Sequence, residues 1–356
     1  MRRLLLILVF ILLPFQVFAT TTLYVDTDAT SPTHPTYSSL NAAITYLQGD
    51  NGGVLDDDFV IECGGAAADT AAIDTTGITT STANTLTIRP ADTDKHGGFF
   101  DASKYHISVS TDDAINLKAG NETIDGIQLR TTASYKYAIE VYNTGGSDGG
   151  DGVSVSVIRN CLIYGTTNAN ARGIYTSGYS SGVIIYNNIL IAGESNDTSI
   201  NRIDGDVWIL NNTISGGWNV GINTGGNRLR YAHNNTSVDN DTDFTGTWTA
   251  ASNNISSDDS APGPNSLINQ IATDLMTDPA NGDYTLKSGS NAIDAGTDLS
   301  AYFTIDITGA TRSAPWDIGA FAYATASGWS GTIYGITPAK IMGVPVSDMS
   351  KVGGVE

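Results

Sequence analysis

The stretch IYNNIL, residues 185–190, returns 24 residues later as ILNNTI, residues 209–214. The doubled asparagine appears again in AHNNTS, residues 232–237, and in ASNNIS, residues 251–256. An earlier relative, IRNCLI, spans residues 158–163. Asparagine is a poor strand former, yet each doublet lies between short apolar segments. The chain therefore needs asparagine at this place for a reason other than strand propensity.

The spacing of these doublets predicts a solenoid. The gaps between successive first asparagines are 27, 24, 23 and 19 residues, and Gly126 holds the matching place one turn earlier. A period near two dozen residues, with short strands and Gly/Asn/Ser turns, is typical of an all-β solenoid. The first asparagines of the doublets are Asn160, Asn187, Asn211, Asn234 and Asn253.

A parallel coil explains the asparagines. Each residue lies above its counterpart at about 4.8 Å, so a column of asparagines can hydrogen-bond along the stack. Asparagine also tolerates the left-handed backbone of a sharp bend. We expect the first column to mark the bend and the second to carry the ladder, with Cys161 in an asparagine position. Cys63 lies several coils earlier, roughly 15 Å or more away, so both cysteines are predicted to be free thiols.

One helix is expected near the start of the chain. TYSSLNAAITYLQ, residues 36–48, has apolar residues at helical spacing and offers Ser38 or Ser39 as an N-cap. An open solenoid end invites edge-to-edge pairing, which a helix laid over the first coil prevents. We therefore predict an all-β parallel β-helix with an N-terminal capping helix.

The first 19 residues have the form of a secretory signal peptide. Arg2 and Arg3 precede an apolar run at residues 4–13, and cleavage is expected after Ala19. The alternative is an uncleaved anchor helix. No later stretch is long and apolar enough to cross a bilayer, so we expect a secreted protein, extracellular or associated with the cell surface.

The chain is strongly acidic. Its formal net charge is −20, and loss of Arg2 and Arg3 with the leader makes it −22. Such a surface repels nucleic acid and anionic lipid, and it argues against a long polyanionic substrate unless cations bridge the two. We therefore expect no nucleic-acid partner.

The C-terminal region carries a second pattern. TDPANGDYTLKSGSNAIDAG spans residues 277–296, and DITGATRSAPWDIGAFAY spans residues 306–323. With TIDG at residues 123–126 and the I-x-N-N repeats, these segments resemble secreted right-handed parallel β-helix proteins, the pectate-lyase-like superfold, with a Q-type choice-of-anchor region. The resemblance covers about residues 23–323. It implies a right-handed helix, export and surface association, and no single reaction.

This organisation divides the chain into five parts. They are a signal peptide (1–19), an N-terminal strand and capping helix (20–57), parallel β-helix coils (58–270), a C-terminal cap (271–323) and a tail (324–356). The tail, with KIMGV and KVGGV 11 residues apart, is a candidate for attachment or assembly; an unstructured terminus is the alternative. In the cap we expect a charge-assisted network of Arg312 with Asp294, Asp306 and Asp317, either structural or for a ligand.

Two groups of residues are candidate binding sites. An aromatic platform for sugar rings is predicted at Trp208, Trp218, Tyr231 and Trp248, although these rings could instead fill the core or cover turns. The alternating aspartates of DNDTD resemble the start of a calcium loop, with a solvated turn as the alternative. They are Asp239, Asp241 and Asp243, so Ca²⁺ is the one cofactor left open, and none is required.

The function expected from these observations is polysaccharide binding at the cell surface. Cleavage by a lyase or glycoside hydrolase stays open, because no catalytic residues can be assigned by spacing. The alternative is a non-enzymatic adhesin or a tailspike-like structural protein that forms a homo-oligomer. The partner in the first reading is a glycan.

Overall fold

The computed structural model describes residues 20–28, 36–142, 154–165, 172–177, 182–192, 196–202, 206–225, 228–324, 340–341 and 344–345. The predicted signal peptide and most of the predicted tail lie outside these residues. Two short strands, β27 (Lys340–Ile341) and β28 (Val344–Pro345), are described in the tail.

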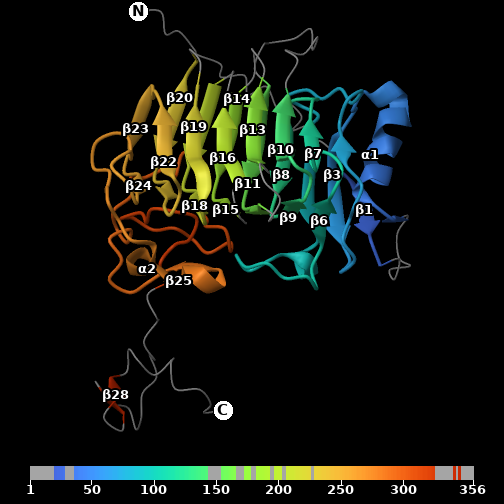
Figure 1. Cartoon of the computed structure of the whole chain (residues 1–356). Helices are drawn as coiled ribbons and strands as arrows, with labels where there is room; N and C mark the ends of the chain where they lie inside the picture. The colour runs from blue at the N-terminus through green and yellow to red at the C-terminus, as the bar shows by residue number, and fades with distance from the viewer. Residues whose placement is uncertain are drawn as a thin grey trace, which may run out of the picture.

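The chain folds as a right-handed parallel β-helix, in which each regular coil adds one strand to each of three parallel sheets (Figure 1). Sheet 1 has ten strands: β2 (Thr36–Tyr37), β1 (Thr20–Asp26), β3 (Asp58–Gly64), β5 (Leu86–Pro90), β8 (Glu122–Asp125), β11 (Val155–Arg159), β14 (Gly182–Tyr186), β17 (Asp206–Leu210), β20 (Arg230–His233) and β23 (Ala250–Ser252). Sheet 2 has seven: β6 (His106–Val109), β9 (Gln128–Thr131), β12 (Leu162–Tyr164), β15 (Ile189–Ile191), β18 (Thr213–Ser215), β21 (Thr236–Ser237) and β24 (Ile255–Ser256). Sheet 3 has seven: β4 (Ile73–Asp74), β7 (Ile115–Leu117), β10 (Tyr137–Tyr142), β13 (Arg172–Ser177), β16 (Asn196–Arg202), β19 (Trp218–Thr224) and β22 (Thr242–Gly246).

The predicted helix covers the first coils. Helix α1 (Leu40–Gly49) begins after Ser39, whose hydroxyl accepts the backbone N–H of Ala42 at 3.2 Å. Its buried face joins the main core at the end of the solenoid (Figure 1). A short 3-10 turn, η1 (Asp50–Gly53), leads from the helix toward β3. The capping role expected for this helix is confirmed by its position.

The core is built from columns of identical positions in successive coils. Ile88, Ile124, Ile158, Ile185 and Ile209 face one another along sheet 1, and all are buried. Burying a side chain of this size contributes about 1.5–3 kcal/mol. The aliphatic residues on either side of each asparagine doublet therefore supply the packing of the solenoid.

The second asparagines form a buried ladder. The side-chain N–H of Asn188 donates to Asn212, that of Asn212 to Asn235, and that of Asn235 to Asn254, each at 3.0 Å. Each Nδ2 also donates to a backbone carbonyl of the preceding coil, as from Asn212 to Ile185 at 2.9 Å. The predicted hydrogen-bonded column is confirmed, and it fixes the register of the coils at this bend.

Cys161 occupies the next position of the ladder. Its backbone N–H donates to Oδ1 of Asn188 at 2.9 Å, as an asparagine there would do. Its Sγ lies 3.8 Å from the carbonyl of Ile124, which corresponds to the carbonyls that ladder amides bind in later coils. Cys161 and Cys63 are both free and buried, as predicted.

Extending the ladder by one residue should stabilise the protein. The amide of a Cys161→Asn variant can donate to Asn188 and to Ile124, replacing a weak thiol donor with two ordinary hydrogen bonds. We expect the free energy of unfolding to rise by about 1 kcal/mol, as measured by urea unfolding. The control is Cys161→Ser, whose shorter side chain cannot donate to both Asn188 and Ile124. A loss of stability in Cys161→Asn, greater than in the control, would contradict the proposed extension.

The first asparagines turn the chain between sheets 1 and 2. Their φ angles lie between 50° and 59°, in the left-handed region, and Gly126 takes 71° at the matching place. Their side chains then hold the C-terminal cap: Asn187 donates to the carbonyl of Ile305 at 2.7 Å, and Asn211 to those of Asp317 and Gly319. The first column therefore both bends the coils and docks the cap.

The cap runs back along the solenoid after the last coil (Figure 1). It starts with α2 (Ala272–Leu275), β25 (Met276–Asp278), η3 (Pro279–Asn281) and β26 (Asp283–Leu286). Its later part places Leu299, Phe303 and Trp316 against the outer face of sheet 1. Phe303 stacks on Tyr186 with the ring centroids 4.4 Å apart.

The predicted charge-assisted network of the cap is confirmed only in part: the charges of Asp306 and Asp317 act on Arg312, but its hydrogen bonds go to other groups. Arg312 is buried, and its Nη2 donates to Oδ1 of Asn187 at 3.0 Å and to two cap carbonyls at 2.8 Å. Asp306 and Asp317 instead accept backbone N–H groups of the cap, including those of Thr308 and Tyr323, while Asp294 donates its own backbone N–H to Asp317. Because the carboxylates of Asp306 and Asp317 are occupied by backbone N–H groups, the guanidinium of Arg312 hydrogen-bonds to backbone carbonyls instead. These contacts hold the turns of the cap together and tie the cap to Asn187.

Among the described residues, no helix has the length and apolar character needed to span a bilayer.

Candidate functional site

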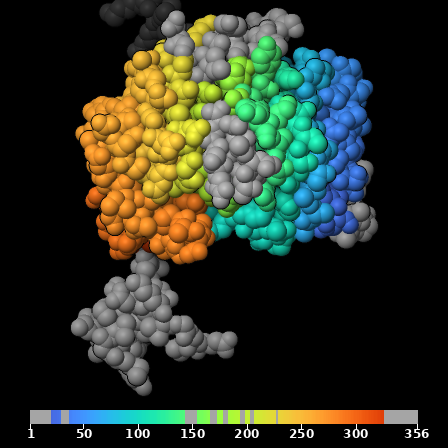
Figure 2. Space-filling model, in the orientation of Figure 1, coloured from blue at the N-terminus to red at the C-terminus, as the bar shows by residue number. Residues whose placement is uncertain are grey.

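Two segments cover the bend between sheets 1 and 2, and they meet along one line. The first is the loop of residues 91–105, which contains η2 (Asp92–Asp94), and the second is the cap. In Figures 1 and 2 the teal loop and the orange cap lie next to each other along the lower edge of the molecule. They meet where a side chain on Gly98 would collide with the ring of Phe321. We call this line the seam.

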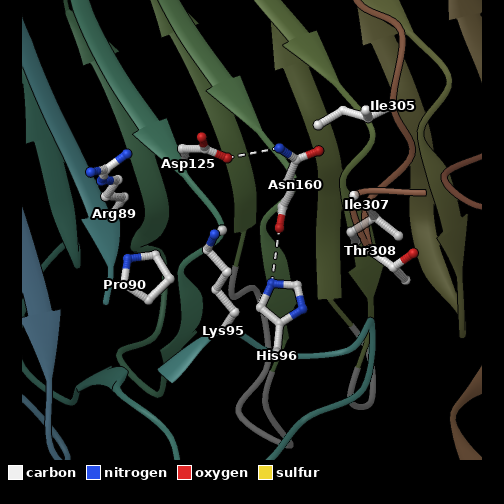
Figure 3. A pocket seen from close by; sticks show the side chains of 11 residues that line it. Arg89, Pro90, Lys95, His96, Asp125, Asn160, Ile305, Ile307 and Thr308 are labelled. Atoms are coloured by element: carbon white, nitrogen blue, oxygen red, sulfur yellow. Dashed lines mark hydrogen bonds between the residues drawn. The ribbon is translucent and has the colours of Figure 1, made fainter. Parts of the chain in front are cut away.

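On the sheet 1 side, the seam opens into a hollow of about 150 Å³ (Figure 3). Sheet 1 and its bend contribute Arg89, Pro90, Asp125, Gly126 and Asn160 to the wall. The loop contributes Lys95 and His96, and the cap contributes residues 305 and 307–309. Polar groups thus converge on a small space whose remaining walls are apolar.

The carboxylate in the hollow is fully engaged. Asp125 accepts from Nδ2 of Asn160 at 2.7 Å and pairs with Arg159 at 2.9 Å. Arg159 also donates to the hydroxyl of Tyr186. Arg89 lies on β5, the strand of sheet 1 that precedes β8 and its Asp125. Its guanidinium pairs with Glu62 at 2.6 Å. This arrangement holds these side chains in place, and both carboxylate oxygens of Asp125 have partners.

His96 is held in one neutral form. The backbone N–H of Gly98 donates to its Nδ1 at 3.1 Å, so the ring proton lies on Nε2 and is donated to the carbonyl of Asn160 at 2.9 Å. Burial lowers the pKa of His96 to about 4. The ring therefore braces the loop against the bend and is not free to exchange protons with a ligand near neutral pH.

The same burial makes stability depend on pH. Below its ordinary pKa of about 6.5, His96 takes up a proton in the unfolded chain but stays neutral in the folded chain, down to pH about 4. Its support of the fold is therefore complete above pH 6.5 and is lost as the pH falls toward 4. Relative to a His96→Gln variant, we expect wild type to lose about 2 kcal/mol between pH 7.5 and pH 5. Urea unfolding of both proteins at the two pH values measures this, and equal pH profiles would contradict the burial of a neutral ring.

On the sheet 2 side, the seam opens into an aromatic groove of about 440 Å³. Phe99 and Phe100 come from the loop, and both are 39% exposed. Phe100 meets Tyr164 of β12 edge to face at 5.4 Å. The opposite wall is the turn of η3 together with Tyr284 of β26. The groove thus combines rings from three segments that lie far apart in the sequence.

The predicted aromatic platform is not assembled as expected. Trp208 and Tyr231 do lie on the outer face of sheet 1, stacked on each other with their centroids 5.4 Å apart. Trp218 is 0% exposed and belongs to the core, which corrects its placement on a surface. Trp248 packs against Phe244 and the core. Sugar binding by the Trp208–Tyr231 pair stays a prediction.

The predicted calcium loop does not form a ligand cage. Asp243 is buried, and its carboxylate accepts from Asn240 and from the backbone N–H groups of Ser257 and Asp258. Asp239 takes a left-handed φ of 59°, and Asp241 is exposed. Within the described ranges, no three His, Cys, Asp or Glu side chains are placed to hold a metal ion. The structure therefore favours the turn over the calcium site, because the inner carboxylate is used by its own neighbours.

The chain matches none of the protein-family models, and no curated protein matches it.

Proposed function

We propose that the protein is an exported, surface-associated β-helix that binds a polysaccharide along the seam. The aromatic groove carries this proposal. Its volume of about 440 Å³ falls within the roughly 300–1,000 Å³ usual for ligand sites. Exposed rings such as Phe99 and Phe100 offer apolar faces to the C–H surfaces of sugar rings.

The neighbouring hollow supports the same proposal. It offers guanidinium, ammonium and amide groups beside apolar walls, which is the mixture that binds hydroxylated ligands. Its acidic group is engaged by Arg159 and Asn160, so the geometry favours binding over catalysis. Cleavage would add to this function, and release of reducing or unsaturated ends from a polysaccharide panel would reveal it.

Removing an exposed ring from the groove should weaken oligosaccharide binding. We expect Phe100→Ala to lower the affinity for the best ligand of a broad oligosaccharide panel about tenfold, because one stacked ring contributes on the order of 1.4 kcal/mol. Isothermal titration calorimetry measures the change.

The matched control is Tyr142→Ala. Tyr142 is 45% exposed on sheet 3, away from the seam, so its loss should leave the affinity unchanged. Equal effects of the two substitutions, or the failure of any glycan to bind, would overturn the proposed function.

A further inference from the structure

Asn160 differs from its neighbours in the first asparagine column. In three later members of this column the side-chain oxygen has a donor: that of Asn187 accepts from Arg312, that of Asn211 from Nδ2 of Asn234, and that of Asn234 from the backbone N–H of Thr297. Asn160 donates to Asp125, but its own Oδ1 is buried and has no hydrogen-bond partner among the described residues. A buried acceptor without a donor is disfavoured, so we expect a ligand to supply a hydrogen-bond donor to this oxygen.

This oxygen faces the hollow at the seam. Figure 3 shows Oδ1 of Asn160 pointing toward Ile305 of the cap, while its backbone carbonyl binds His96. Ile305 is 39% exposed, so its side chain can turn aside without leaving a packed core. Its backbone stays anchored through the hydrogen bond from Asn187. A ligand group that displaces the Ile305 side chain can therefore reach Oδ1 of Asn160.

The lining of the hollow defines the group that fits. Oδ1 of Asn160 needs a hydrogen-bond donor, whereas Arg89 and Lys95 at the rim offer donors to an acceptor. Pro90 and Ile307 add apolar wall. A volume of about 150 Å³ is below that of usual whole-ligand sites, so the hollow suits a substituent of a larger chain.

An acetamido group has one N–H donor, one carbonyl acceptor and one methyl group. A carboxylate has no donor for Asn160, and a polyanion is repelled by a chain of net charge −20. A hydroxyl can donate but leaves the apolar wall uncovered. We propose that the hollow binds the acetamido group of an N-acetylated sugar, with Asn160 accepting its N–H. This inference rests on the proposed polysaccharide binding at the seam and names the class of sugar.

Three tetrasaccharides separate the alternatives: N-acetylchitotetraose, cellotetraose with hydroxyls in place of the acetamido groups, and tetragalacturonate with carboxylates. We expect the full chain to bind the N-acetylated ligand about tenfold more tightly than cellotetraose, as measured by calorimetry. Tetragalacturonate should bind most weakly. Equal affinities, or tightest binding of tetragalacturonate, would overturn the inference while leaving polysaccharide binding intact. If none of these ligands and no other glycan binds, the proposed function itself fails.

The Asn160→Gly variant tests whether Asn160 accepts the N–H of the acetamido group. Gly126 holds the same column position one coil earlier with a left-handed φ of 71°, so glycine suits the backbone of Asn160. The variant should lose the tenfold preference for the N-acetylated ligand over cellotetraose. Asn253→Gly, at the far end of the column, is the matched control and should keep the preference. An unchanged preference in Asn160→Gly would overturn the assignment.

Ile305→Trp provides a second test that keeps Asn160. The larger ring should fill the hollow at an exposed position, and the backbone contact of residue 305 remains. We expect loss of the preference for the N-acetylated ligand. A preference that persists with the hollow filled would place recognition elsewhere.

Discussion

Replacing Asn212 with alanine is expected to lower the free energy of unfolding by about 4 kcal/mol. Asn212 is fully buried, its Oδ1 accepts two N–H groups of Asn188, and its Nδ2 donates to Ile185, Leu210 and Asn235. Truncation leaves several of these groups unsatisfied, at about 1–3 kcal/mol each, and opens a small cavity. Urea unfolding followed by circular dichroism measures the loss.

The matched control is Asn223→Ala. Asn223 belongs to a shorter asparagine pair on sheet 3, where its side chain is half-buried and donates to Asn201 at 3.2 Å. Removing it should lower the free energy of unfolding by less than about 1 kcal/mol, because water can replace the lost partner. Similar losses in the two variants would mean that the buried ladder has no special role.

Replacing Arg312 with alanine is expected to undock the cap. The guanidinium ties Asn187 of the solenoid to the carbonyls of Gly319 and Ala320, and it lies within 6 Å of the ring centroids of Phe303 and Trp316. Burial lowers its pKa to about 10, so it remains charged near neutral pH. Its loss leaves carbonyls buried without donors, and we expect about 3 kcal/mol less protection of the cap.

Hydrogen exchange separates a local from a global effect. In Arg312→Ala, amides of residues 292–323 should exchange faster, while those of sheet 3 keep their protection. Arg130→Ala removes an exposed arginine on β9 and should change neither region. If the cap of Arg312→Ala keeps wild-type protection, the apolar contacts alone hold it.

The repeated features of the fold follow directly from the sequence. Asn188, Asn212 and Asn235 recur at a near-constant period, so their stacking requires only that the coils be parallel. The left-handed bends at the first asparagines and the free thiols follow from the same register. Periodicity is local information, and a solenoid converts it into contacts between neighbouring coils.

The site could not be predicted in this way because it forms only where the loop and the cap, which lie outside the repeats, meet the repeat strands. Phe99 and Phe100 come from a loop, Tyr164 from a strand and Tyr284 from the cap, and no spacing relates these positions. Their one local signal is an apolar doublet directly after Gly97 and Gly98, where a polar turn is usual. Trp218 is predicted as a surface residue although it is buried, because residue type alone does not reveal that its ring points into the core.

Hydrogen exchange of the full chain, with and without the tightest-binding oligosaccharide of a broad panel, locates the surface that binds the ligand. Binding along the seam predicts new protection in residues 96–106 and 279–284, on the two sides of the aromatic groove. Protection confined to β17 and β20, which carry the Trp208–Tyr231 stack, would contradict binding at the seam.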